Sequence, residues 1–383
     1  MKKRYFLPLV LPLFWACGNQ QDRHGNPTAD ALFMEQDSVL MDVSEYSDTV
    51  TIRYARGLTV EYLGDSIRVS IQNPDASARR SQPQQIMLPR NSEAQRNTFL
   101  CTTALQLGNF EVLGLEDRIV GINSLRNLFS PRMKEQLSSG HTTRVGKEGN
   151  FDLETILALQ PSYIFVSASK HGGFEALRDC GIPLITHHGY KEQHPLGQAE
   201  WIKLVGLLTG EPRRANAVFS SIERKYMTLQ QEVAALDSLS RPTVVSGRQL
   251  RDGWYIVGGR SYMAQLFRDA GARYVMDDNE DTGGTTLDFE AVYARGVDAD
   301  FWQTDGSFDG EFTLQHLASE DPRYATMRAF GQHHVLFCNL AHTPYRELAG
   351  VQPHLLLADF VKAFHPELLP HYTPRYYQLL CDK

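Results

Sequence analysis

The feature that most constrains the fold is a helical block that interrupts a regular alternation of strands and helices. From Phe99 onward, short apolar runs such as TFLCTT and YIFVSA alternate with helix-like stretches such as LETILALQ and FEALRDC. This alternation is typical of a parallel sheet with helices on both faces. Residues 196–237 carry two consecutive helical patterns, and the alternation resumes after Pro242. The sequence therefore predicts two α/β lobes separated by helices.

The second helical pattern of this block is long enough to connect two lobes. It starts at Pro212, a residue suited to a first helical turn. The pattern covers about 25 residues, or nearly 40 Å at about 1.5 Å per residue. Its apolar positions recur at helical spacing, at Ala215, Val218, Phe219, Ile222, Tyr226, Leu229 and Val233.

A weak internal repeat supports two similar lobes. The stretch FDLETILALQPSYIFVS, with Asp152 and Glu154, resembles LDFEAVYARGVDADFWQT, with Asp288 and Glu290. In each stretch a helical pattern ends in a short turn before a strand pattern. The two halves are therefore expected to share one βα arrangement.

The first residues indicate export rather than part of the fold. Residues 2–4 are basic, and residues 5–15 form an apolar run that is too short to span a bilayer. Cys17 follows a small residue just past this run, as in a bacterial lipoprotein signal, which predicts that Cys17 is lipidated. The alternative is an ordinary signal peptide with a chance cysteine. Residues 18–47 are polar and are expected to be a tether.

Composition limits the class of protein. With 383 residues, 42% of them hydrophobic, the chain can form about two domains. The net charge is −7 without a block of Lys and Arg, which argues against a nucleic-acid partner. The remaining cysteines lack C-x-x-C spacing, so neither zinc nor a redox motif is indicated. An exported protein can form disulfides, but the sequence selects no pairing among Cys101, Cys180, Cys338 and Cys381.

Before the alternating region, two runs have strand character. They are TVTIRYA and LTVEYLGDSIRVSIQNP, with turn residues at Gly57 and at Gly64-Asp65. They predict an antiparallel start whose association with the N-terminal lobe stays open.

Several stretches together resemble the periplasmic substrate-binding lipoproteins of ABC importers for iron-siderophore, haem and cobalamin. The resemblance covers roughly residues 95–370 and depends on the order and spacing of LGLEDRIVGI, FDLETILALQPSYIFVS, HPLGQAEWIKLVGLLTG, GGRSYMAQLFRDAGARYV, LDFEAVYARGVDADFW and LLLADFVKAFHPELLP. It implies the helical-backbone class of binding proteins, in which two Rossmann-like lobes with parallel-rich sheets are bridged by one long helix and hold a ligand between them.

This resemblance divides the chain into five parts. We expect a signal peptide at 1–17, a tether at 18–47, an N-terminal lobe at 48–195, linking helices at 196–240 and a C-terminal lobe at 241–383. The implied protein is a monomer on the periplasmic side of the cell envelope, held to the membrane by lipid. Its implied partners are an inner-membrane permease, an ATPase subunit and a small metal chelate, with no resident cofactor.

A glycine pair before a helix is the first candidate ligand contact. Gly258-Gly259 follows an aromatic strand, and the next helix pattern begins near Ser261. In the implied fold this turn brings the helix start to the cleft, where free N–H groups face ligand oxygens and Ser261 caps the helix. Arg260 and Ser261 are therefore candidate contacts. The spacing G-x-G-x-x-G is absent, which argues against a dinucleotide.

Aromatic and hydroxyl residues form a second group of candidates. Trp254, Tyr255 and Tyr262 flank the glycine turn and suit a flat macrocycle or catecholate ring. Residues 254 and 255 alternate across a strand, so only one of them faces the cleft. Thr102 and Thr103 end the first core strand, where ligands gather in open α/β sheets, and either bind ligand or cap the next helix.

Basic residues after strands form a third group. Arg126, Lys170, His171 and Arg346, which follows Tyr345, are placed to bind the carboxylates of an anionic chelate. For Arg126 an ordinary surface position is equally consistent. Tyr190 follows His187 and His188, and imidazole and phenolate both bind iron, but the histidine spacings match no fixed metal motif. No metal site is therefore predicted, and ligation of a haem iron by one of these His or Tyr residues stays open. Tyr190 and Tyr345 are included among the candidate ligand contacts.

The resemblance also implies a permease-docking glutamate on each lobe. Glu290 matches the family position in LDFE, and Glu175 is the looser match on the other lobe, with Glu154 as its rival through the repeat. The alternative for each is an ordinary first-turn carboxylate.

These features predict a binding protein that captures a ferric siderophore or haem and delivers it to a permease. Cobalamin is the close alternative. The sequence is less consistent with an exported histidine-dependent metalloenzyme, because no catalytic motif such as G-x-S-x-G or H-E-x-x-H occurs, or with an adhesin-like lipoprotein.

Overall fold

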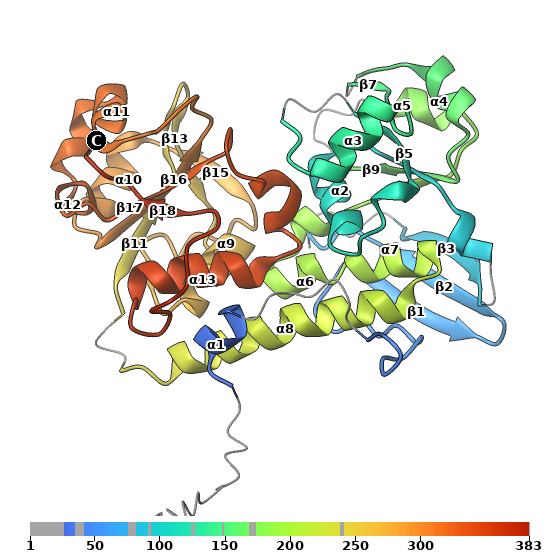
Figure 1. Cartoon of the computed structure of the whole chain (residues 1–383). Coiled ribbons are helices and arrows are strands. Elements are labelled where there is room, and N and C mark those ends of the chain that lie inside the picture. Colours follow the sequence, from blue (N-terminus) through green and yellow to red (C-terminus); the bar gives the residue numbers. More distant parts are fainter. Residues whose placement is uncertain are drawn as a thin grey trace, which may run out of the picture.

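The computed structural model shows two α/β lobes above one long helix, as the sequence predicts (Figure 1). It describes residues 27–34, 42–75, 82–90, 93–123, 127–147, 149–167, 174–237 and 241–382. Cys17, Arg126, Lys170 and His171 lie outside these residues.

The N-terminal lobe contains a five-stranded parallel sheet with the order β10-β9-β4-β5-β6. Its strands are β4 (Phe99–Cys101), β5 (Ile119–Ile122), β6 (Thr143–Arg144), β9 (Tyr163–Val166) and β10 (Leu184–Thr186). Between them run α2 (Ala104–Glu111), α3 (Pro131–Ser139), α4 (Leu153–Leu159), α5 (Glu175–Arg178) and the hairpin of β7 (Gly146–Lys147) and β8 (Asn150–Phe151).

The C-terminal lobe repeats this plan with the order β14-β11-β16-β17-β18, in which β18 is antiparallel to β17. Its strands are β11 (Thr243–Ser246), β14 (Arg273–Tyr274), β16 (Phe301–Gly306), β17 (Val335–Asn339) and β18 (Gln378–Leu379). A small antiparallel sheet joins β12 (Arg248–Leu250), β13 (Gly253–Val257) and β15 (Gly284–Leu287). The helices of the C-terminal lobe are α9 (Tyr262–Asp269), α10 (Phe289–Gly296), α11 (Leu314–Glu320), α12 (Arg328–Gly331) and α13 (Pro353–Phe364).

Three helices connect the lobes: α6 (Pro195–Ala199), α7 (Ile202–Thr209) and α8 (Pro212–Ala234). Helix α8 is 23 residues long, begins with Pro212 and runs beneath both lobes (Figure 1). Its predicted apolar stripe is buried at Ala215, Phe219, Ile222, Tyr226, Leu229 and Val233, and half-buried at Val218. The bridging helix is therefore confirmed.

The internal repeat is also confirmed as structure. Asp152 and Asp288 are the N-cap residues of α4 and α10, and Glu154 and Glu290 lie in the first turns. Each helix leads into a parallel strand of its lobe, β9 in one and β16 in the other.

The chain before the N-terminal lobe forms a three-stranded antiparallel meander of β1 (Leu58–Leu63), β2 (Ser66–Ile71) and β3 (Gln84–Pro89). The meander packs with the N-terminal lobe, because the side-chain amide of Gln84 donates to the Leu184 carbonyl and accepts from the Thr186 N–H. The turn at Gly64 is confirmed by its φ of 62°.

The strand predicted for TVTIRYA is wrong. The backbone N–H groups of residues 53–55 donate to the buried carboxylate of Glu200, and those of Arg56 and Gly57 donate to Glu192. These donors serve carboxylates rather than a neighbouring strand, so the segment stays irregular.

Part of the predicted tether is ordered. Helix α1 (Ala29–Met34) packs on α8, and the Ala29 N–H donates to the Glu232 carboxylate at 2.7 Å. Ala29, Leu32 and Phe33 lie on one apolar face, and the ring of Phe33 contacts Tyr372 of the C-terminal lobe. These three apolar residues at helical spacing could have indicated the helix. The polar composition of residues 18–47 as a whole obscured this pattern.

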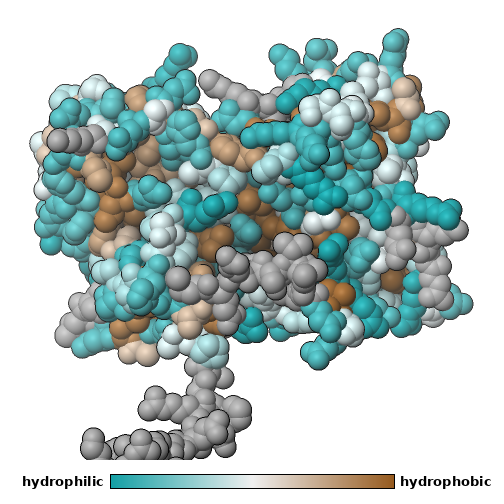
Figure 2. All heavy atoms as spheres, in the orientation of Figure 1, coloured by the Kyte–Doolittle hydropathy of each residue, from teal (hydrophilic) through white to brown (hydrophobic). Residues whose placement is uncertain are grey.

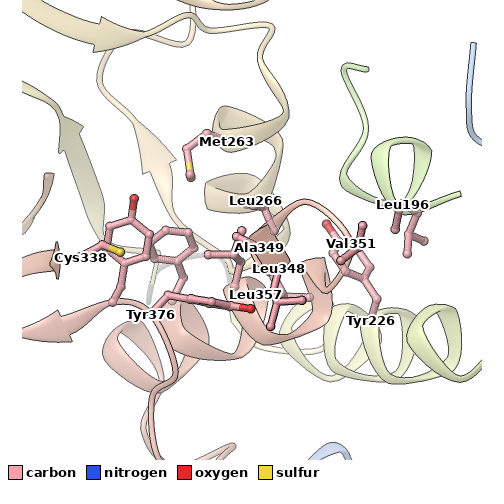
Figure 3. Close-up of a cluster of buried hydrophobic side chains, with 14 of the residues drawn as sticks. Leu196, Tyr226, Met263, Leu266, Cys338, Leu348, Ala349, Val351, Leu357 and Tyr376 are labelled. Carbon is pink, nitrogen blue, oxygen red and sulfur yellow. The ribbon is translucent and has the colours of Figure 1, made fainter. Parts of the chain in front are cut away.

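The lobes share apolar packing beneath the cleft. The π-helix η7 (Tyr345–Ala349) of the C-terminal lobe contacts α2 of the N-terminal lobe. Figure 3 shows the cluster at this junction, where Leu348 and Ala349 of η7 lie near α9 and α13, and Val351 lies near Leu196 and Tyr226. In the space-filling view the upper outline dips between the lobes, and hydrophobic residues gather at their junction (Figure 2). Within the described ranges, no helix has the length and apolar character to cross a membrane.

Candidate ligand-binding site

A cavity between the lobes is the candidate ligand site. It encloses about 420 Å³ and is lined from both lobes, a size typical of pockets for small molecules. The N-terminal lobe contributes Thr102, Thr103, Ala104, Leu105, Asn127 and Phe129, and the C-terminal lobe contributes Ser307, Leu340, Thr343, Arg346 and Glu347. Three predicted ligand residues, Thr102, Thr103 and Arg346, are therefore brought to one cavity.

The wall from the N-terminal lobe is built at the carboxyl end of β4. The side-chain oxygen of Gln106 accepts the N–H groups of Thr102 and Thr103, which fixes this turn at the start of α2. The Thr102 hydroxyl donates to the Phe165 carbonyl at 2.9 Å, so it serves the lobe itself. Thr103 is the N-cap residue of α2 and forms a capping box with Gln106, one of the two roles predicted for it. Beyond this capping box, its buried hydroxyl has no hydrogen-bond partner among the described residues. Of the two threonines, Thr103 is the one left to bind a ligand.

Two predicted ligand residues of the C-terminal lobe, Tyr262 and Tyr345, are not among the residues that line the cavity. The hydroxyls of Tyr262 and Tyr345 lie 3.3 Å apart, and burial raises the pKa of both phenols, so both stay neutral. The guanidinium groups of Arg248 and Arg346 interact electrostatically with the exposed Asp305. Asp305 interacts electrostatically with both tyrosines.

A carboxylate of the C-terminal lobe ties the floor of the cleft to the N-terminal lobe. The two oxygens of Glu347 accept the N–H groups of Phe129 at 2.8 Å and Ser130 at 3.2 Å, at the start of α3. A carboxylate is favourable at a helix N-terminus because it meets free N–H groups and the positive end of the dipole. Burial raises the pKa of Glu347. The side-chain amide of Asn127 adds a second link by donating to the Leu340 carbonyl.

The glycine turn does not serve the cleft. The N–H of Gly258 donates to the Gly283 carbonyl and that of Arg260 to the Asp281 carbonyl. A Cβ on Gly258 or Gly259 would collide with backbone carbonyls of residues 276–283. The turn therefore packs against a loop of its own lobe, which accepts the N–H groups of Gly258 and Arg260.

The predicted ligand residues beside this turn differ in burial and in hydrogen-bond partners. Ser261 caps α9, as predicted, since its hydroxyl accepts the Ala264 N–H. Arg260 is exposed and pairs with Glu280 at 2.7 Å. Trp254 is 0% exposed and donates to the Ser246 carbonyl, so it belongs to the core of the C-terminal lobe. Tyr255 is 43% exposed. The two residues point to opposite faces of the strand, as alternation predicts, but neither is among the residues that line the cavity.

The histidine and tyrosine group at 187–190 is not part of the cavity lining. The rings of His187 and Trp201 pack in a tilted arrangement with centroids 4.6 Å apart. Burial lowers the pKa of His187 to about 3 and that of His188 to about 4. Tyr190 lies at the surface beside Lys191. The part of the chain that the structure describes holds no group of three or more His, Cys, Asp or Glu arranged for a metal ion. Its four cysteines, at 101, 180, 338 and 381, are all free.

Several cavity residues escaped the sequence prediction. Asn127, Ser307, Thr343 and Glu347 follow strands or begin short helices, but they lie outside any motif. The position of Ser307 just after β16 and of Leu340 just after β17 is a usable signal, because ligands gather at the carboxyl ends of parallel strands.

Comparisons with known proteins agree with this architecture. A family model described as periplasmic binding protein matches residues 100–339. The chain is 24% identical over 238 residues to an uncharacterised lipoprotein of Methanocaldococcus jannaschii, a match that covers 61% of this chain and 55% of that protein. The chain therefore spans about half the length of that relative.

Two solved structures share the fold. A periplasmic haem-binding protein from Pseudomonas aeruginosa has a TM-score of 0.58 at 20% identity, covering 75% of this chain and 99% of that one. A protein of an Fe3+-hydroxamate transport system from Saccharomonospora viridis has a TM-score of 0.56 at 14% identity, covering 74% and 96%. At these identities the likeness concerns the fold alone.

Proposed function

The chain belongs to the periplasmic binding protein family, and from this premise we propose that it captures an iron complex, either a ferric siderophore or haem, between its lobes. It delivers the complex to the permease of an ABC importer. The observation that carries the proposal is the cavity lined from both lobes, with Thr103 on one wall and Arg346 on the other.

The chemistry of the cavity suits a metal chelate. Arg346 is exposed and makes no ion pair or hydrogen bond within the described part of the chain, so its guanidinium is available to a carboxylate or hydroxamate oxygen. Similarity to a haem-binding protein and to a protein of an Fe3+-hydroxamate system supports the same ligand class. The family consists of binding proteins, and the ligand leaves unchanged.

For the permease, one exposed glutamate on each lobe is the proposed contact. Glu290 is 82% exposed in the first turn of α10. Glu175 begins the short α5 and is exposed, but Glu154 has the position in α4 that Glu290 has in α10. We therefore place Glu154 beside Glu175 as a candidate for the N-terminal lobe, because the repeat relates it directly to Glu290.

The location proposed is the periplasmic side of the membrane, with a lipid on Cys17. Replacing Cys17 with Ser is expected to move the protein from the membrane fraction to the soluble fraction, measured by fractionation of cells. Retention of the C17S protein in the membrane would contradict the anchor.

A ligand panel tests the binding function. Purified protein is titrated with haem, cobalamin, a ferric trihydroxamate and a ferric tricatecholate, and binding is followed by absorbance and by thermal shift. We expect one iron complex to bind stoichiometrically, and R346A to weaken it about tenfold or more by removing a charge-assisted contact. The exposed Arg224 of α8 makes no ion pair or hydrogen bond within the described part of the chain, so R224A is the matched control. Binding of cobalamin alone would contradict the proposed iron complex, and turnover of a ligand would contradict the binding role.

A further inference from the structure

An accessible carboxylate in the cleft wall suggests which iron complexes the protein selects. Asp305 lies near the carboxyl end of β16, two residues before Ser307 of the cavity lining. Its side chain is exposed, and it forms no hydrogen bond or ion pair within the described residues. An unpaired carboxylate at the edge of a ligand cavity is available to a hydrogen-bond donor or a cation.

Asp305 lies beside one face of the small antiparallel sheet of the C-terminal lobe. Arg248, Tyr255 and Thr286 are directly opposite one another across β12, β13 and β15, so they share one face of this small sheet. Asp305 interacts electrostatically with both Arg248 and Tyr255 of this face. A Cβ on Gly284 would lie 1.8 Å from the Tyr255 hydroxyl oxygen, so the Tyr255 ring lies over a glycine. The Tyr255 ring and Asp305 therefore interact with each other, and Asp305 lies two residues before Ser307 of the cavity lining.

The two arginines near Asp305 differ in whether an ion pair already neutralises the charge of the guanidinium. The Arg248 guanidinium donates to both oxygens of Glu320 at 2.9 and 3.0 Å, so its charge already has a partner. Arg346 has none within the described part of the chain. The wall thus offers a ligand one negative group, Asp305, and one positive group, Arg346.

We propose that Asp305 makes the cleft selective for metal chelates that bring a hydrogen-bond donor or positive charge to the Tyr255 wall, and that it excludes chelates that place an anionic group there. This inference rests on the proposed function. A ligand with both a donor and an acceptor, such as a hydroxamate chelate with amide or ammonium arms, satisfies Asp305 and Arg346 together. A triply anionic catecholate complex would meet a like charge at Asp305, and repulsion of a wrong ligand is a common source of specificity.

The test uses pairs of ligands that differ in charge alone. The first pair is a ferric trihydroxamate with a free ammonium arm and the same complex after N-acetylation, and the second is haem and its dimethyl ester. A ferric tricatecholate is the polyanionic probe. Dissociation constants are measured by quenching of tryptophan fluorescence for wild type, D305N and D298N. Asp298 precedes the opposite end of β16 and is exposed, which makes D298N the charge-matched control.

We expect the wild-type protein to bind the trihydroxamate with the free ammonium arm about tenfold more tightly than its N-acetylated form, as one charge-assisted contact allows. Haem and its dimethyl ester differ instead at the carboxylates proposed to bind Arg346, so this pair reports on Arg346. D305N should remove this preference and tighten binding of the catecholate complex, whereas D298N should retain the wild-type ratio. In parallel, G284A should weaken both members of a pair equally by displacing the Tyr255 ring. G283A is its control, because a Cβ at Gly283 meets no atom within 4 Å.

The outcomes separate this inference from the proposed function. If the wild type binds iron complexes but D305N and D298N give the same charge preference, Asp305 is not the selective group and the inference is overturned. If the wild type binds none of the five probes, the proposed function itself fails and the inference fails with it.

Discussion

At the scale of single residues, Glu111 is expected to make stability depend on pH. It lies at the end of α2, and burial together with the nearby carboxylates of Glu347 and Glu116 raises its pKa from 4.5 to about 7, against the opposing effect of Arg375. Between these two values the folded protein keeps a proton that the unfolded chain has released. The free energy of unfolding therefore falls as pH rises through this window, by at most about 3 kcal/mol.

The variant E111Q should remove this decrease and be more stable than the wild type above pH 7. Urea unfolding at pH 5 and pH 8 measures the difference. The exposed Glu135 of α3 provides the control E135Q, which should leave the pH dependence unchanged. A wild-type protein that is equally stable at both pH values would contradict the raised pKa.

Individual site residues could be predicted only where a general rule of the fold points to them. Thr103 was found because ligands gather at the carboxyl ends of parallel strands. Asp305 obeys the same rule at the end of β16, but its stretch DADFWQTDG contains three acidic residues, and only the strand register shows which one reaches the cleft. Trp254 was misplaced because its partners Trp302 and Tyr324 lie far away in sequence.

At the scale of elements, a buried carboxylate holds the entry segment to the linking helices. Glu200 is fully buried and accepts three successive N–H groups from residues 53–55, while Lys203 pairs with it at 2.8 Å. E200Q should lower the free energy of unfolding by about 3–5 kcal/mol, because it leaves a buried ammonium without its counter-charge. Denaturant unfolding measures this loss. The exposed pair of Glu61 and Arg68 gives the control E61Q, expected to change stability by less than about 0.5 kcal/mol.

These donors also explain why the element prediction failed at this segment. TVTIRYA has strand composition, but composition does not show that carboxylates about 140 residues later take its backbone donors. The alternating elements from β4 onward were predicted well, because their signals are local periodicity and turns.

A close contact between elements of different lobes gives a second prediction at this scale. A Cβ on Gly108 of α2 would lie 1.8 Å from the Glu347 carbonyl oxygen of η7. Alanine normally stabilises a helix relative to glycine, but G108A should destabilise this protein by about 1–3 kcal/mol through overpacking. Thermal unfolding measures the effect. At Gly331 of α12 a Cβ meets no atom within 4 Å, so G331A should cause no comparable loss. A stabilised G108A would show that α2 and η7 separate readily.

At the scale of the whole molecule, the two lobes are expected to unfold together. The helical block between two alternating halves of the sequence was enough to predict one sheet in each lobe and the helix that bridges the lobes. It did not predict the apolar packing that the lobes share beneath the cleft. That packing joins Leu107 and Phe110 of α2, Leu348 of η7 and Leu357 of α13 in one apolar cluster. Independent domains often unfold in separate steps, whereas a continuous core couples them. Rigid linkage of this kind also limits how far the cleft can open.

Tryptophan fluorescence tests this coupling, because each lobe has its own reporter. After removal of residues 1–17, the remaining tryptophans are Trp201 beside the N-terminal lobe and Trp254 and Trp302 in the C-terminal core. W201F reports on the C-terminal lobe alone, and the double variant W254F/W302F reports on Trp201 alone. Since core substitutions shift stability by themselves, each variant is compared with its own circular dichroism transition. Coincident fluorescence and circular dichroism midpoints in both variants are expected. In the opposite outcome, the fluorescence midpoint precedes the circular dichroism midpoint in one variant and follows it in the other. That result would mean that the lobes unfold separately. The shared core would then not limit the opening of the cleft.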